Sequence, residues 1–137
     1  MWLPRSVFSA CALTAMALSL PASAQPAADG ASAQPLSVVM TNFKFTPNEL
    51  RFHHGTAYRL EFTNRGTSDH NFTSPEFFSA VSIAPEDRGK VVDGKVEVDE
   101  GQTVAVRVEA LKPGSYPFHC SHFLHASFGM TGSATID

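Results

Sequence analysis

The sequence predicts an all-β fold, a sandwich or barrel built from short strands. Two observations lead to this class: apolar and polar residues alternate in several segments, and turn-forming residues separate those segments at short intervals. One stretch, residues 74–89, lacks the alternation. The remaining chain, from about Leu36 to Asp137, has the roughly hundred residues of one ordinary domain. We therefore expect a single domain over residues 36–137.

The N-terminal 24 residues have the organisation of a secretory signal peptide. Arg5 precedes a short apolar run, and the small residues at 22–24 provide a cleavage site. The run is shorter than the roughly 20 apolar residues that cross a bilayer, so we expect no transmembrane anchor after cleavage. Residues 25–35 are small and Ala-rich, which is typical of a flexible leader. These features predict export, and we expect a periplasmic protein.

The charges of the chain argue against nucleic-acid binding. Formal net charge is −3, and it becomes −4 when Arg5 leaves with the signal peptide. The basic residues are scattered and form no patch that could follow a phosphate backbone.

Three segments carry the alternation most clearly, and each places its apolar side chains on one face. They are residues 58–63 with Tyr58, Leu60 and Phe62, residues 95–99 with Val96 and Val98, and residues 103–108 with Val104, Val106 and Val108. This pattern is typical of antiparallel strands with one buried face.

Turn residues define the connections between the strands. The dipeptide Asp93-Gly94 predicts a two-residue hairpin between "KVV" and "KVEV", because such a turn needs positive φ at both central positions. Pro75 after Ser74 predicts the start of a short helix over about 75–82.

The segment "SYPFHCSHFLHASFGM", residues 115–130, concentrates the chemically active side chains. Alternation along its strand turns Cys120 inward, and His125 and Met130 follow at intervals of five residues. Cys120 is the only cysteine of the domain, so an intramolecular disulfide is impossible and the thiol is buried, paired between molecules or bound to a ligand.

A thiolate, an imidazole and a thioether form a soft ligand set that suits copper. Zinc is the main competitor, but structural zinc sites usually contain two or more cysteines and no methionine. A trigonal copper site needs a second histidine, and His70 in "SDHNFTS" is the best candidate. Its rivals His53 and His54 adjoin a turn and are expected in solvent. His122 is the rival of His125 within the loop.

The motif Tyr-x-Phe-x-Cys-x4-His-x4-Met, together with the dipeptide His70-Asn71, resembles the cupredoxins, the blue copper proteins that include plastocyanin, azurin and auracyanin. The resemblance extends over nearly the whole domain and implies a Greek-key β-sandwich. It also implies one type 1 copper ion, whose ligands would be His70, Cys120, His125 and Met130. In the family, the backbone N–H of the residue matching Asn71 donates to the cysteine sulfur, and its side chain reaches the residue matching Ser121.

Two departures from the family pattern affect the expected function. The loop lacks the Pro or Gly that commonly precedes its histidine, and its spacing also resembles the type 1 site of multicopper oxidases. Those enzymes carry further His-x-His pairs, which this chain lacks. We therefore expect a non-enzymatic, monomeric protein that shuttles single electrons between redox partner proteins.

A copper-binding carrier or copper-resistance protein is the alternative, because His119 and His122 crowd around Cys120 and His125. His119 itself should point outward into solvent. Apolar residues surround His125, and we expect them to form a docking patch for a redox partner, with one of the two phenylalanines packed beneath the loop. These residues are Phe123, Leu124 and Phe128.

Overall fold

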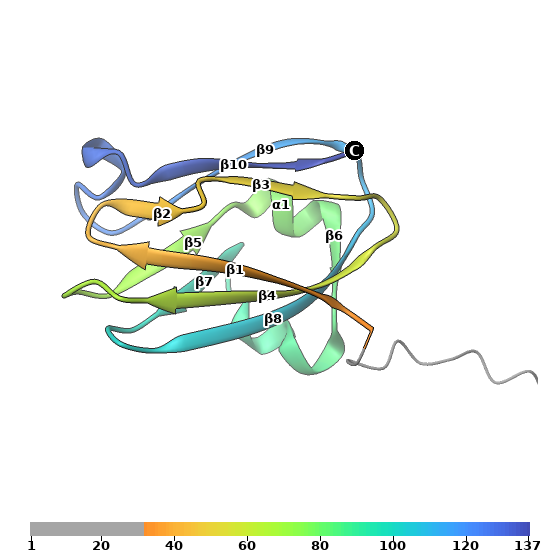
Figure 1. The fold of residues 1–137 in the computed structure, drawn as a ribbon, viewed down its shortest axis with the longest axis horizontal. Coiled ribbons are helices and arrows are strands. Elements are labelled where there is room, and N and C mark those ends of the chain that lie inside the picture. The colour runs from red at the N-terminus through yellow and green to blue at the C-terminus, as the bar shows by residue number, and fades with distance from the viewer. Residues whose placement is uncertain (1–31) are drawn as a thin grey trace, which may run out of the picture.

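Two five-stranded sheets face each other and enclose the core in residues 32–137, the part of the chain that this computed structural model describes (Figure 1). The first sheet has the order β2 (Lys44–Thr46), β1 (Gln34–Thr41), β4 (Ala57–Asn64), β8 (Thr103–Ala110), β6 (Val81–Ile83). The second has the order β3 (Glu49–Phe52), β10 (Thr131–Ile136), β9 (Gly114–His119), β5 (His70–Thr73), β7 (Lys95–Val98). The predicted all-β sandwich is confirmed.

Three short helices connect the strands: α1 (Pro75–Ala80) and the 3₁₀ helices η1 (Pro85–Lys90) and η2 (Ala126–Phe128). Helix α1 begins at the predicted residue and ends before the predicted one, because Val81 takes an extended conformation and pairs with Ala110 of β8. Among residues 32–137, no helix is long and apolar enough to span a membrane.

The N-terminal boundary of the fold lies slightly before the predicted one. Strand β1 begins at Gln34 and pairs with β4 from that residue on, so the last two residues of the predicted leader belong to the sheet. The predicted signal peptide, residues 1–24, lies outside the described residues, as does the leader up to residue 31.

Strand direction differs from the expectation in two places. β1 runs parallel to β4, and β3 runs parallel to β10, so both sheets are mixed. Alternating apolar residues show that a strand has one buried face, but the same pattern occurs whichever way the neighbouring strand runs. The predicted antiparallel arrangement holds for the remaining pairs, including β4 with β8 and β9 with β10.

Of the predicted hairpin at Asp93-Gly94, the turn forms but the ladder of paired residues does not. Both residues have positive φ, 52° and 70°, as a type I′ turn requires. Only one bridge, between Val92 and Lys95, joins the two sides. The residues before it belong to η1, which is held against β8 and therefore cannot extend the ladder.

Phenylalanine rings fill the space between the sheets. Phe72 of β5 is central, with its ring centroid 4.5 Å from that of Phe118 and 4.9 Å from that of Phe62. Among residues 32–137, the fully buried phenylalanines are Phe45, Phe52, Phe62, Phe72, Phe77 and Phe118. Because Phe118 and Phe72 stand on the strands that lead to Cys120 and His70, this packing fixes the positions from which both side chains project.

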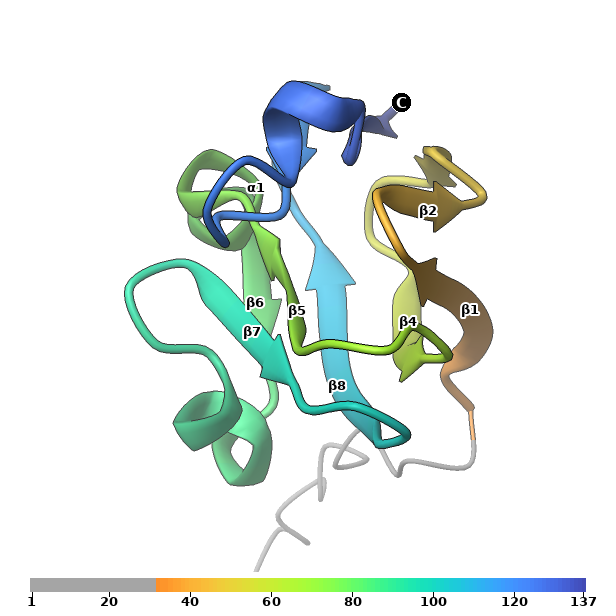
Figure 2. The same ribbon diagram turned by 90° about the vertical axis from the view of Figure 1, so that its left-hand side faces the viewer.

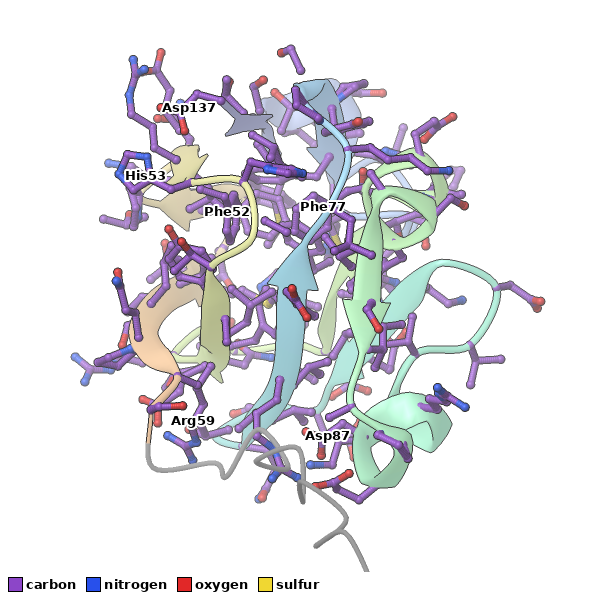
Figure 3. The ribbon with its side chains drawn as sticks, turned by 90° about the vertical axis from the view of Figure 1, so that its right-hand side faces the viewer. Phe52, His53, Arg59, Phe77, Asp87 and Asp137 are labelled. Carbon is purple, nitrogen blue, oxygen red and sulfur yellow. The ribbon has the colours of Figure 1, made fainter. Side chains whose placement is uncertain are left out.

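Asp87 anchors η1 to β8 at the end of the molecule seen in Figure 3. Its side chain is 4% exposed and accepts hydrogen bonds from the Arg107 side chain at 2.8 Å and from Lys90 at 2.7 Å. Burial by itself would raise the pKa of this carboxyl, but the bonds from Arg107 and Lys90 outweigh it and hold the pKa well below its usual range.

We expect Asp87→Asn to lower the free energy of unfolding at pH 7 by about 1.5–3 kcal/mol, the usual value of hydrogen bonds to a charged group. Because the folded-state pKa is depressed, this contribution is complete above the unfolded pKa of about 3.9 and declines as pH falls below it. Urea unfolding should therefore show a smaller difference between the two proteins at pH 3 than at pH 7. Glu86→Gln removes an exposed partner of Arg107 and should cost much less.

Candidate metal centre

Three side chains from distant parts of the chain meet at one end of the sandwich, the end that faces the viewer in Figure 2. The ligand atoms of His70, Cys120 and His125 all lie within 4.8 Å of one another. Nδ1 of His125 is 3.4 Å from the Cys120 sulfur, Nδ1 of His70 is 3.9 Å from it, and the two Nδ1 atoms are 3.2 Å apart. Two nitrogens and one sulfur therefore converge on a common point.

The strands and one closed loop place these atoms. His70 is the first residue of β5, opposite Val98 of β7, and Cys120 directly follows β9. The Cys120 N–H donates to the Met130 carbonyl at 3.1 Å, and the Met130 N–H donates to the His125 carbonyl at 3.1 Å. These two bonds close the loop between Cys120 and Met130, and the closed loop carries His125.

Met130, the residue predicted as the axial ligand, has a buried side chain. Met130 is 0% exposed, as are Cys120 and His70, whereas His125 is half-buried. The backbone of Met130 is hydrogen-bonded to both Cys120 and His125, so this residue lies at the same end of the sandwich as the cluster.

The connection between β4 and β5 fixes His70 from the other side. Asn64 is buried, donates to the carbonyls of Ser68 and Val98 at 2.9 Å, and accepts the Gly66 N–H at 2.9 Å. Gly66 lies against the His70 ring: a Cβ added to it would lie 2.6 Å from Nε2 of His70. The segment Asn64-x-Gly66 is a recognised sequence signal for a turn closed by the Asn side chain, and this signal could have pointed to the residue that packs against His70.

Asn71 and Ser121 join the two segments that carry the converging side chains. The Asn71 side chain accepts the Ser121 N–H at 2.8 Å and donates to the Ser121 hydroxyl at 2.9 Å. The backbone N–H of Asn71 also hydrogen-bonds the Cys120 sulfur. Both contacts have the form that the cupredoxin resemblance implies.

Burial controls the protonation of the centre. It raises the pKa of the Cys120 thiol, and the backbone N–H groups of Asn71 and His122, which hydrogen-bond the sulfur, oppose the rise. Burial also lowers the pKa of His70, and the nearby imidazoles of His125 and His122 lower it further. A neutral His70 imidazole is the form that binds a metal, whereas Cys120 must lose its proton to do so.

The other histidines lie outside this cluster. His53 is exposed at the opposite end of the sandwich, where its Nδ1 is 2.8 Å from a carboxylate oxygen of Asp137 (Figure 3). His54 and His119 are also exposed, as predicted. His122 contacts the carboxylate of Glu97, and its ring lies 5.6 Å from that of His125. Of the two rivals in the loop, it is therefore His125 that faces the sulfur.

Comparison with known families identifies the domain. The family model described as a cupredoxin-like domain matches residues 10–133. The chain belongs to this family. No curated protein matches the sequence.

Several solved cupredoxin structures share this fold. The reduced auracyanin of Roseiflexus castenholzii has 18% identity and a TM-score of 0.57, with 77% of this chain and 98% of that chain covered. Auracyanin B has 20% identity and a TM-score of 0.58, covering 77% and 90%. A multicopper oxidase has 16% identity and a TM-score of 0.56, covering 75% of this chain and 41% of that one. At these identities the likeness concerns the fold.

The donor set of this cupredoxin fits copper. One thiolate and two imidazoles can take a trigonal arrangement, and a thioether such as that of the buried Met130 is the type of weak fourth donor that such a site accepts. A structural zinc site would instead gather further thiolates, and among residues 32–137 Cys120 is the only cysteine. The types of donor atom and their positions therefore both fit a copper ion.

Exposed apolar residues lie in the loop of His125 and in the turn that packs against its ring, and together we call them the His125 rim. Its members are Phe43, Phe123, Leu124 and Phe128, with exposed fractions of 42%, 87%, 46% and 63%. Phe43 was not predicted to belong to this surface; it lies in the turn between β1 and β2 with φ 63°, and its ring centroid is 5.2 Å from that of His125. The expectation that one loop phenylalanine lies beneath the loop is wrong, because Cys120 and Met130 already occupy the inward positions.

Proposed function

We propose that this cupredoxin is an exported type 1 copper protein that shuttles single electrons between larger redox proteins. The observation that carries the proposal is the convergence of two imidazole nitrogens and one thiol within 4.8 Å at the end of the sandwich. His70, Cys120 and His125 would hold one copper ion, and Met130 would be its weaker fourth ligand. Copper supplies the redox change, since it is stable in two oxidation states with such donors.

The protein's part in electron transfer is to keep the donor atoms in place. The Cys120 and His70 side chains project from adjacent regions of one sheet, and Asn71 and Ser121 tie those regions together. The loop of His125 is closed by backbone bonds to Met130. Because both oxidation states can use this donor geometry with little rearrangement, the reorganisation required for each electron is small.

The His125 rim supports a docking role. His125 is half-buried and is the one member of the cluster that reaches the surface, between Phe43 and the exposed residues of its own loop. A small apolar surface of this kind suits brief encounters, since electron-transfer complexes have small interfaces. We infer transient redox partner proteins that approach His125, and we expect the protein itself to be a monomer that acts without catalysing a reaction.

A copper carrier or resistance factor is the second candidate, in the same periplasmic location. The position of His122 favours it, because this half-buried imidazole lies beside His125 and could accept copper on its way into or out of the centre. Electron shuttling remains the first choice because a carrier has to release copper, and ligands that are buried and fixed in position do not favour release.

Copper titration of the mature protein tests the proposal. We expect one equivalent of Cu(II) to produce an intense visible band, which ascorbate removes and ferricyanide restores over repeated cycles without loss of metal. A second tightly bound Cu(I), or loss of metal to a competing chelator in each cycle, would favour the carrier. Binding of Zn(II) in preference to copper would contradict both functions.

A further inference from the structure

Glu97 belongs to none of the metal-ligand motifs in the sequence, yet its carboxylate contacts both segments that carry the metal centre. It stands on β7, opposite Asn71 of β5. One of its oxygens accepts a hydrogen bond from the Asn71 side chain at 3.1 Å, and the other contacts Nε2 of His122. Asn71 adjoins His70, while His122 belongs to the loop that carries His125. Glu97 therefore spans the boundary between the two segments that form the centre.

The contact with Glu97 selects one orientation of the Asn71 amide. The amide nitrogen donates to Glu97 and to the Ser121 hydroxyl, and the amide oxygen accepts the Ser121 N–H and the Thr73 hydroxyl. If the amide were reversed, its oxygen would face the Glu97 carboxylate and its nitrogen would face the Ser121 N–H. Both contacts would then be repulsive, so Glu97 favours the orientation that joins β5 to the ligand loop.

Asn71 and His122 also supply backbone hydrogen bonds to the Cys120 sulfur. The backbone N–H groups that face the sulfur belong to Asn71 and His122, and these are the two residues whose side chains Glu97 holds. Hydrogen bonds to the cysteine sulfur are among the features that set the potential of a copper–thiolate centre.

We propose that Glu97 is a positioning residue of the metal centre, which holds both sulfur-bonding backbone segments in place through its contacts with Asn71 and His122. The inference rests on the proposed copper site, because it assigns the residue a role toward that site. The proposed role differs from a simple charge effect, because Glu97 acts through two directed contacts. Another carboxylate at the same end of the sandwich therefore cannot replace it.

Two variants of Glu97 separate the contacts from the charge. Glu97→Gln removes the charge and keeps a side chain that can accept from Asn71 and meet His122, whereas Glu97→Ala removes both contacts. Glu100 provides the matched control pair, Glu100→Gln and Glu100→Ala, because it is an exposed carboxylate in the turn after β7 and its side chain makes no contact with Asn71 or His122. Circular dichroism should first establish that all four variants are folded.

The first measurement uses the copper-free protein and the reaction rate of Cys120 with a disulfide reagent such as dithiobis(nitrobenzoate). We expect Glu97→Ala to react about fivefold faster than Glu97→Gln, since loss of roughly 1 kcal/mol of hydrogen bonding makes opening of the loop about fivefold more frequent. The two Glu100 variants should react at the same rate as each other and as the parent protein.

The second measurement is the reduction potential of the copper-loaded proteins. Hydrogen bonds to the sulfur withdraw electron density from it and favour the reduced state, so we expect Glu97→Ala to have a lower potential than Glu97→Gln. Equal thiol rates and equal potentials in these two variants would overturn the role of Glu97 and leave the copper site standing. Failure of the parent protein to bind copper would instead remove the proposed function, while the thiol rates would still decide whether Glu97 closes the loop.

Discussion

Replacing Cys120 with serine should abolish the intense visible band of the copper-loaded protein. In the proposed centre, the band arises from charge transfer from the thiolate to copper, and a serine hydroxyl cannot supply it. The two imidazoles remain, with their Nδ1 atoms 3.2 Å apart, so some copper should still bind, more weakly and without the colour. Visible absorption and electron paramagnetic resonance of the variant after addition of one equivalent of Cu(II) would measure both effects.

Ser121→Ala is the control for that experiment. It removes a neighbouring hydroxyl that accepts from Asn71 but leaves the Ser121 backbone N–H bond to the same side chain. Its band should persist with at most a small shift. If the band survives in Cys120→Ser, the thiolate is not the copper ligand and the proposed centre is wrong.

Gly66→Ala should weaken copper binding roughly tenfold or more, although Gly66 supplies no ligand. A methyl group at this position would lie 2.6 Å from Nε2 of His70 and 2.6 Å from the side-chain oxygen of Asn42, closer than real contacts of this kind. The His70 ring is fully buried and must shift to relieve the contact. Overpacking of this kind costs about 1–3 kcal/mol. This cost weakens copper binding, because the His70 ring must return to its place beside Cys120 when copper binds.

Competition with a chelator of known affinity would measure the loss of binding in Gly66→Ala. Gly89→Ala is the matched control, because an added Cβ there meets nothing within 4 Å and the residue lies in η1. An unchanged copper affinity in Gly66→Ala would mean that the His70 ring does not need its present position, which would count against His70 as a ligand.

The approach of Cys120 and His125 to each other was predictable from the sequence, because their spacing follows from local rules. Strand alternation turns Cys120 inward, and the short loop after it can return only a nearby residue such as His125 to the sulfur. His70 is distant in the sequence, and the cupredoxin resemblance supported it through the neighbouring Asn71. The structure brings all three together, while their role as ligands remains the proposal that the copper experiments test.

Residues that act across strand pairs were not predictable in this way. Glu97 and Asn71 meet because β7 pairs with β5 in one particular register, and a polar residue on an outward face gives no sign of its cross-strand partner. Phe43 reaches His125 from a turn at the other edge of the sandwich end, and Gly66 matters only because the His70 ring lies against it. Each of these three contacts depends on the distance between segments in the folded chain, which a local sequence pattern does not reveal.

The sequence by itself determined the class of fold and the chemistry of the donor set, because side-chain periodicity and residue identity are properties of short segments. Strand direction, with the parallel pairs β1–β4 and β3–β10, and the place of Phe43 in the His125 rim were decided only by the tertiary structure. The physical reason is that these features arise from the simultaneous burial of both sheets against one layer of phenylalanine rings. That packing selects one register among several that the alternating segments would allow.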